Sequence, residues 1–123
     1  MPWNFDNSIP IYLQIIQEMK RKIIRKELAP GERLPSVRDL AKEAGVNPNT
    51  MQKALTELET RGLIETERTT GKYVTDNKEQ ISLLREDYLR ERLEPFMKEL
   101  SSMGLEEEEL VSLIRKHYKE AKE

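Results

Sequence analysis

The 123-residue sequence contains no cysteine. Disulfides, thiolate catalysis and cysteine-based zinc sites are thereby excluded, and a reducing compartment is favoured. No apolar run approaches the roughly 18 residues that a membrane-spanning helix needs, and the N-terminal segment MPWNFDNSIP lacks the basic and apolar regions of a signal peptide. We therefore expect a cytoplasmic protein without membrane association.

Groups that carry out chemistry are also scarce. The single histidine, His117, has neither a cysteine nor a second histidine near it, and the five glycines never form a phosphate-binding pattern. The many carboxylates are spread along helices opposite basic residues, as on solvated faces. We therefore predict that the protein is not an enzyme, with no catalytic residue, no metal site and no cofactor.

What the sequence has in excess is charge. Charged residues make up 36% of it, against about a quarter in an average soluble domain. The length predicts one domain, or one small domain with an appendage, which buries only a modest core. The formal net charge of −2 argues at first sight against a nucleic-acid partner.

Three helical patterns occupy the first half of the chain. The first runs from Ile9 to Leu28, the second follows the capping residue Ser36, and the third follows the capping residue Asn47. A glycine ends each of the last two patterns. The residues expected on the buried faces are Tyr12, Ile15, Ile16, Met19 and Ile23, then Val37, Leu40, Ala41 and Ala44, and then Met51, Ala54, Leu55 and Leu58.

Two short strands are expected next. Residues 63–67 and 72–75 have a strand pattern, and residues 68–71 between them supply a polar hairpin loop that contains a glycine. The order helix, helix, tight turn, helix, hairpin is that of a winged helix-turn-helix. We assign residues 1–76 to this domain and residues 77–123 to a helical region, so the fold class is mainly α with a small β-hairpin.

In a helix-turn-helix the second helix enters the major groove and reads bases from its N-terminal residues. Asparagine and glutamine side chains pair with adenine, and a helix N-terminus favours phosphate. For Asn47 alone we prefer a capping role, but for the group as a whole we favour DNA contact over ordinary surface. The side chains at this end of the third helix are Asn47, Pro48, Asn49, Thr50, Gln52 and Lys53.

Several motifs match a known family. In their order and spacing they resemble the GntR family of bacterial transcription regulators over about residues 9–75, and the Asn-Pro-Asn-Thr version with a tail of under fifty residues resembles the YtrA-type subfamily. The resemblance implies a homodimer that binds an inverted-repeat operator in double-stranded DNA, often of a transporter operon and usually as a repressor. The motifs are PIYLQI (10–15), PGERLPSVRDLA (30–41), GVNPNT (45–50), AL-x-x-LE-x-x-GLI (54–64) and GKYV (71–74).

The resemblance also assigns roles by position. It places the family's DNA-contacting arginine of the second helix at Arg38. Many members have arginines where this sequence has Pro48 and Gln52, and arginine reads guanine best. We therefore expect Asn49 and Gln52 to shift the base preference toward adenine. The early recognition-helix contacts and the wing-tip glycine fall at Asn47, Asn49, Thr50, Gln52 and Gly71.

The wing has two interpretations. Arg68, Thr69, Thr70 and Lys72 are either a solvated hairpin or, with Gly71 allowing close backbone approach, a contact to phosphate or the minor groove. We favour the contact. The complete set of predicted DNA-binding residues is Ser36, Arg38, Asn47, Asn49, Thr50, Gln52, Lys53, Arg68, Thr70, Gly71 and Lys72.

The tail of residues 77–123 is predicted to be a two-helix dimerisation region. Left on a monomer, its apolar stripe would be a sizeable exposed patch, which usually marks an interface. A symmetric dimer would cover the patch and present two recognition helices one DNA turn, roughly 34 Å, apart. In the alternative, the helices fold back on the winged domain of the same chain, and Trp3 and Phe5 fit either core. The predicted dimer contacts are Leu84, Tyr88, Leu89, Leu93, Phe96, Leu110, Ile114 and Tyr118.

Two other functions stay open beside a dimeric DNA-binding regulator. The first is a winged-helix module that binds protein instead of DNA. Salt dependence separates the two, because DNA affinity falls steeply with salt as counterions are released. The second is a sensor of a small-molecule effector of unknown identity, with a pocket between the dimer halves near Tyr88, Phe96 and Tyr118.

The distribution of charge removes the objection raised by the net acidity. Residues 1–77 hold 12 bases and 11 acids, whereas residues 78–123 hold 9 bases and 12 acids. The acidity thus lies mainly in the tail and does not exclude DNA binding. With so weak a basic field, we expect low non-specific affinity, which leaves more of the discrimination to base contacts.

Overall fold

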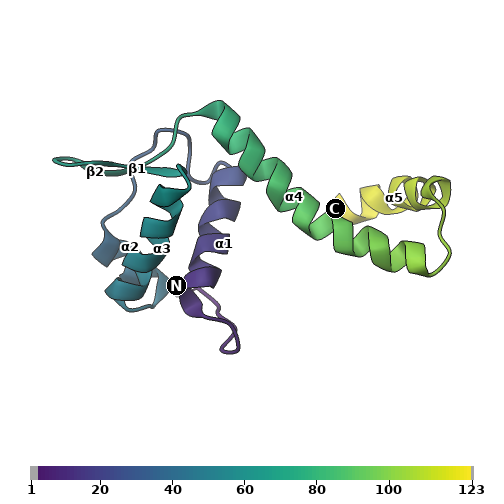
Figure 1. Cartoon of the computed structure of the whole chain (residues 1–123), viewed down its shortest axis with the longest axis horizontal. Helices are drawn as coiled ribbons and strands as arrows, with labels where there is room; N and C mark the ends of the chain where they lie inside the picture. Colours follow the sequence, from purple (N-terminus) through teal and green to yellow (C-terminus); the bar gives the residue numbers. More distant parts are fainter. Residues whose placement is uncertain (1–2, 123) are drawn as a thin grey trace. The chain divides into compact units, whose positions relative to one another are not determined.

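The computed structural model describes residues 3–122, which fold into helices and one short hairpin. The mainly helical class with a small hairpin is confirmed, and so is the order of a winged helix-turn-helix followed by two helices (Figure 1). Along the chain the elements are α1 (Ile11–Ile24), α2 (Val37–Ala44), α3 (Pro48–Thr60), β1 (Ile64–Glu67), β2 (Gly71–Val74), α4 (Lys78–Ser102) and α5 (Glu107–Lys122).

The chain divides into two compact units, Met1–Arg85 and Glu86–Glu123, here called the winged unit and the C-terminal unit. The first two turns of α4 belong to the winged unit because Ile81 and Leu84 pack against its hydrophobic core. Only 8% of Leu84 is exposed. Its side chain is therefore part of the fold of the winged unit, whereas the sequence placed it among the dimer contacts, and we leave it out of the proposed interface.

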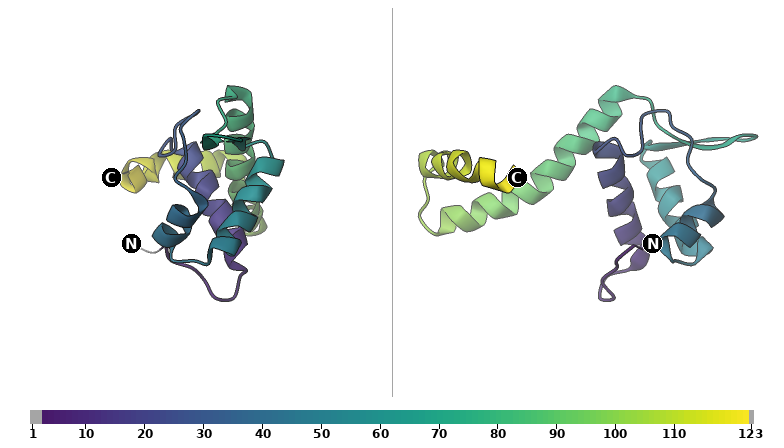
Figure 2. Two further views of the ribbon diagram at one scale, coloured as in Figure 1. Left: turned by 90° about the vertical axis from the view of Figure 1, so that its left-hand side faces the viewer. Right: turned by 180° about the vertical axis from the view of Figure 1, so that it is seen from behind.

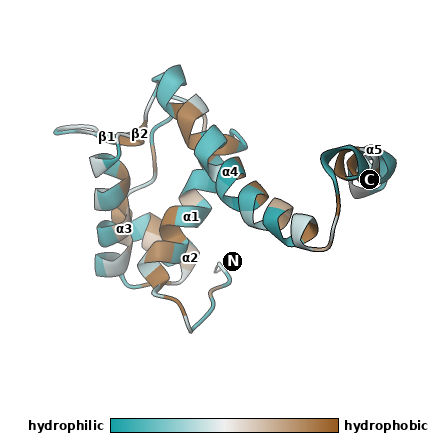
Figure 3. Cartoon of the chain, turned by 45° about the vertical axis from the view of Figure 1, so that its right-hand side comes forward, coloured by the Kyte–Doolittle hydropathy of each residue, from teal (hydrophilic) through white to brown (hydrophobic). Residues whose placement is uncertain are grey.

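The core of the winged unit is formed by buried hydrophobic residues of α1, α2, α3 and the base of the hairpin, and hydrophobic segments of these elements are coloured brown in Figure 3. Trp3 and Phe5 also pack against this core. The sequence alone allows them to belong either to this core or to that of the C-terminal helices. The Trp3 N–H donates to the carbonyl of Ala44 at 3.1 Å, which ties the N-terminal segment to the end of α2. The predicted inner faces are confirmed by the burial of Ile15, Ile16, Met19, Ile23, Leu40, Ala41, Ala44, Met51, Ala54, Leu55 and Leu58.

The first helix is shorter than its apolar pattern. It ends at Ile24, because Lys26 adopts a left-handed conformation with φ of 64°. The N–H of Glu27 then donates to the carbonyl of Lys22 at 2.9 Å, which closes the helix as a Schellman motif. Leu28 still packs against the core after the turn. The apolar pattern of the sequence therefore extends beyond the end of the helix.

The hairpin projects away from the three helices of the winged unit, as the view from behind shows (Figure 2). Its antiparallel register pairs Ile64 with Val74 at the base and Thr66 with Lys72 further out. Residues 31–34 run along the other edge of β2, where the Leu34 N–H donates to the carbonyl of Lys72 at 2.8 Å. The sequence predicted the two strands but missed this third edge.

The C-terminal unit consists of the rest of α4 and the whole of α5. Helix α4 continues through Pro95 without a break, and the chain turns at Met103 and Gly104 before α5. Across residues 3–122, no helix has both the length and the apolar character required to cross a membrane.

Candidate nucleic-acid interface

The first turn of α3 is fixed by its own capping residue. The side-chain oxygen Oδ1 of Asn47 accepts the backbone N–H of Asn49 at 2.7 Å, and Pro48 is the first helical residue. The predicted cap is thus confirmed. Because the oxygen of Asn47 serves the helix, its amide nitrogen is the group that remains for a ligand.

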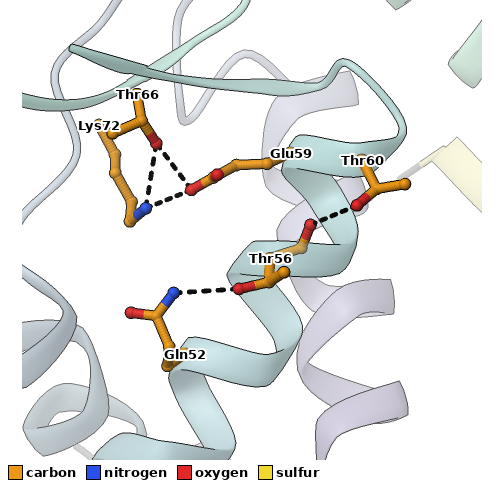
Figure 4. Close-up of polar contacts among 6 residues, drawn as sticks. All are labelled: Gln52, Thr56, Glu59, Thr60, Thr66 and Lys72. Atoms are coloured by element: carbon orange, nitrogen blue, oxygen red, sulfur yellow. Dashed lines mark hydrogen bonds and ion pairs between the residues drawn. The ribbon is translucent and has the colours of Figure 1, made fainter. Parts of the chain in front are cut away.

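Two amide side chains stand on the outer side of α3. Asn49 and Gln52 are exposed, whereas Thr50 is half-buried. Gln52 Nε2 donates to Thr56 Oγ1 at 3.0 Å, one turn further along the helix (Figure 4). This bond leaves Gln52 with its second N–H and its carbonyl oxygen, which is the donor and acceptor pair that adenine requires. Thr56 therefore fixes the orientation of the Gln52 amide.

The preceding helix α2 begins with a cap of the same kind. Ser36 Oγ accepts the backbone N–H of Asp39 at 3.1 Å, and Gly45 ends the helix in the left-handed conformation with φ of 76°. Arg38, on the first turn, is exposed, and its guanidinium forms no ion pair within residues 3–122. A free guanidinium at the start of α2 is well suited to bind phosphate.

Substitutions at Ser36 separate its capping role from its predicted DNA contact. Ser36→Ala should lower the free energy of unfolding by about 1 kcal/mol because the Asp39 N–H loses its acceptor. Ser36→Asp should retain the stability of the wild type, since aspartate caps equally well, yet weaken DNA binding by placing a carboxylate near phosphate. Denaturant unfolding and a DNA titration measure the two effects. Unchanged DNA affinity of Ser36→Asp would remove Ser36 from the interface.

Lys53 faces the first helix. Its ammonium nitrogen lies 3.9 Å from the centre of the Tyr12 ring in α1, which is a cation–π contact. Any DNA contact by Lys53 must therefore compete with this interaction.

In the wing, Arg68, Thr69 and Thr70 form an exposed turn between the strands. Gly71 follows with φ of 123°, and a Cβ atom there would lie 3.3 Å from Nε of Arg33. The backbone conformation favours glycine at this position, and the Arg33 side chain lies close beside it. The close approach of Gly71 to DNA stays a prediction. Arg33 brings a further cation to the wing, beside the exposed turn.

Lys72 lies on the side of the hairpin that faces α3 (Figure 4). It forms an ion pair with Glu59 near the end of α3, and it also donates to Thr66 Oγ1 at 3.1 Å. Thr66 Oγ1 in turn donates to Glu59 at 2.7 Å. The three side chains form a closed polar cluster between the recognition helix and the wing.

The charge state of Glu59 reflects this cluster. Partial burial by itself raises the pKa of the carboxyl group, but the hydrogen bonds from Lys72 and Thr66 and the Lys72 charge outweigh it and lower the pKa below the ordinary 4.5. Glu59 is therefore a carboxylate at neutral pH, and it neutralises Lys72.

Sequence reasoning missed four residues of this site, which are Arg33, Thr56, Glu59 and Thr66. The pair of Gln52 and Thr56 could have been found, because residues four apart share a helix face. Glu59 and Arg33 carried no such signal, since their partners Lys72 and Gly71 are brought to them only by the path of the hairpin.

Most of the predicted dimer contacts lie in the C-terminal unit with their side chains unburied. Tyr88 and Leu110 are half-buried, and the Arg92 guanidinium lies 3.3 Å from the centre of the Tyr88 ring. Hydrophobic and hydrophilic segments alternate along α4 (Figure 3). The exposed large hydrophobic residues of this unit are Leu89, Leu93, Phe96, Met97, Met103, Val111, Leu113, Ile114 and Tyr118.

An open apolar groove of about 480 Å³ lies within the C-terminal unit. Phe96 lines it, but Tyr88 and Tyr118, the other two residues of the predicted effector pocket, do not. Its main apolar lining residues are Leu93, Phe96, Met97, Leu100, Leu105, Leu110, Val111 and Ile114.

Carboxylate and histidine side chains are the candidate metal ligands among the described residues. Across residues 3–122, no three carboxylate or histidine side chains gather as metal ligands would. The ring of His117 lies 3.2 Å from the carboxylate of Glu120, on the exposed surface of α5.

Comparison with known proteins gives relatives that are all described as transcription regulators. The pattern of the family described as bacterial regulatory proteins, gntR family, matches residues 11–74. The HTH-type transcriptional regulator YhcF of Bacillus subtilis is 41% identical over 111 residues, which are 90% of this chain and 92% of that protein. The HTH-type transcriptional repressor YtrA of the same organism is 40% identical over 110 residues, 89% of this chain and 85% of that protein.

A solved structure extends the likeness to the fold. A GntR family transcriptional regulator from Listeria monocytogenes superimposes with a TM-score of 0.85 at 39% identity, covering 91% of this chain and 98% of the other. The similarity therefore includes the C-terminal helices as well as the winged unit.

Proposed function

Because the chain belongs to the gntR family of bacterial regulatory proteins, we propose that it is a homodimeric repressor that binds an inverted-repeat operator. Family membership itself makes the protein a transcription regulator with a helix-turn-helix DNA-binding domain, not an enzyme. Repression is supported by the name of the relative YtrA, and a transporter operon is the target that the resemblance favours.

The observation that carries the proposal is the first turn of α3. Asn49 and Gln52 are exposed there on a helix whose other face is anchored by Met51, Ala54 and Leu55 in the core. Such a helix can enter the major groove without rearrangement. The proposed contacts are Arg38, Asn47, Asn49, Thr50 and Gln52, with Ser36, Lys53, Arg68, Thr70 and Gly71 beside them.

The dimer is proposed from the C-terminal unit. Large hydrophobic side chains are exposed along α4 and α5, and an exposed apolar surface of this kind usually marks an interface. A symmetric pair of chains covers this surface and places two recognition helices on one side of the duplex. The proposed division keeps the DNA-binding domain that the sequence assigned to residues 1–76, adds the first two turns of α4 that pack against it, and assigns dimerisation to the rest of the tail, residues 86–123.

A second role, as an effector-responsive regulator, is favoured by the groove of about 480 Å³. It has the size of a small-ligand site and a mainly apolar lining. In the proposed dimer the partner chain and the ligand compete for the same side chains. This competition would couple effector binding to dimerisation.

Selection of random duplexes by the protein tests the proposal. We expect inverted repeats whose half-sites carry adenine at the positions read by Asn49 and Gln52. Affinity for the selected duplex should fall steeply as salt is raised, because bound counterions are released. Half-sites with only guanine at the contacted positions would contradict the adenine readout. Binding that ignores sequence would contradict the operator itself.

A further inference from the structure

The wing is a short hairpin that needs support near its tip. Each strand has four residues, and an isolated two-stranded hairpin is at best marginally stable in water. Residues 31–34 add backbone pairing along the outer edge of β2 as far as Lys72, but they do not hold β1 or the turn beyond it. Ile64 and Val74 are buried and hold its base against the core. The turn at Arg68, Thr69 and Thr70 is exposed, so its position depends on whatever ties the outer part of the hairpin to the helices.

The polar cluster of Glu59, Thr66 and Lys72 supplies this tie. Thr66 and Lys72 are opposite each other in the register, one pair before the Glu67–Gly71 pair that ends the ladder. Both side chains therefore project from the same face of the hairpin, and both donate to Glu59 (Figure 4). Glu59 lies seven residues after Gln52, about 10 Å further along α3, and so well behind the turn that reads bases.

The environment of Lys72 differs from that of the solvated pairs. Its side chain is 18% exposed, against 47% for Arg61 in the ion pair with Glu57 on the same helix. To reach phosphate, Lys72 would have to leave both of its partners. The partly buried Glu59 carboxylate would then lose its ion pair. Its charge is also cancelled by Glu59, so it adds little to the field that DNA experiences.

We propose that Glu59, Thr66 and Lys72 form a clamp that holds the wing at a fixed position relative to the DNA-reading turn of α3. Lys72 is then a positioning residue and not a DNA contact. Glu59, although negatively charged, contributes to operator affinity through the position of the wing. The inference rests on the proposed function, because it concerns how the same interface meets the operator.

The sign of the effect at Glu59 distinguishes the clamp from a direct contact by Lys72. If the clamp positions the wing, Glu59→Gln should weaken binding to the selected duplex by about threefold to tenfold. Lys72→Met should weaken it by a similar factor, and the double variant should be no worse than either single one. If Lys72 instead contacts phosphate, Glu59→Gln removes a negative charge and frees the lysine. Binding then tightens, and Lys72→Met lowers the salt slope by about one.

Reversal of the pair gives the decisive comparison. The variant E59K/K72E has the same net charge as the wild type and rebuilds the ion pair in the opposite direction. The clamp predicts that it binds the duplex better than Glu59→Lys alone, with the salt slope of the wild type. A direct contact predicts that it stays as weak as Lys72→Glu, because a carboxylate then occupies the contact position.

Glu57→Gln is the matched control, because it removes the same charge from the same helix but its partner Arg61 is not in the wing. It should leave affinity nearly unchanged or slightly raise it. Melting temperatures of all variants show that the winged unit is folded. Tighter or unchanged binding of Glu59→Gln, or failure of the reversed pair to recover, would overturn the clamp. Failure of the wild type to prefer any duplex would instead refute the proposed function.

Discussion

Replacement of both Asn49 and Gln52 by alanine lowers affinity for the selected operator by roughly 30-fold or more, toward the level of non-specific DNA. Each bidentate base contact contributes about 1–3 kcal/mol of discrimination, and every 1.4 kcal/mol is tenfold in affinity. Both side chains are exposed and neither belongs to the hydrophobic core, so the melting temperature should change little. Fluorescence anisotropy with operator and scrambled duplexes measures the loss.

The same helix provides the control for this double variant. Thr60 is exposed on α3, and its hydroxyl donates only to the carbonyl of Thr56, at 3.0 Å. Thr60→Ala should therefore bind the operator as the wild type does. Thr56→Val removes the acceptor of Gln52 Nε2, and its operator affinity should lie between that of Thr60→Ala and that of the double variant. Operator affinity that survives the double variant would mean that α3 does not read the sequence.

The parts of this interface that could be predicted from the sequence depend on local spacing. Ser36 precedes Asp39 by three residues and Asn47 precedes Asn49 by two, so each cap is contained within one turn of chain. The buried faces of α1, α2 and α3 likewise follow from helical periodicity alone. For these features the fold adds nothing that neighbouring residues do not already specify.

The rest depends on contacts that only the folded chain creates. Residues 31–34 pair with β2 although nearly 40 residues separate them from it, and Lys72 meets Glu59 only because the hairpin turns back over α3. Lys72 therefore looked like a free cation in the sequence. Leu84 was equally ambiguous, since an apolar residue in a helical stripe fits a monomer core and a dimer interface alike.

Leu93→Glu tests the proposed dimer. Among substitutions outside α3, it is expected to have the largest effect on association and on operator affinity. Leu93 lies in the C-terminal unit, is 48% exposed, and lines the apolar groove. In a symmetric interface one substitution introduces two carboxylates, and each loses its hydration without a partner. The variant should sediment as a monomer at concentrations where the wild type is a dimer.

Loss of the dimer should also remove most of the operator affinity. A dimer binds its second half-site as an intramolecular event, which commonly adds a factor of about 10² to 10⁴ in affinity. The monomer retains an intact recognition helix, so it should bind a single half-site as tightly as before while losing its preference for the inverted repeat. Leu83→Glu is the matched control, because Leu83 lies on the same helix and is 56% exposed, but falls outside the proposed interface. If Leu93→Glu remains dimeric, the association must use another surface. If both variants dissociate, the interface must extend to the first turns of α4.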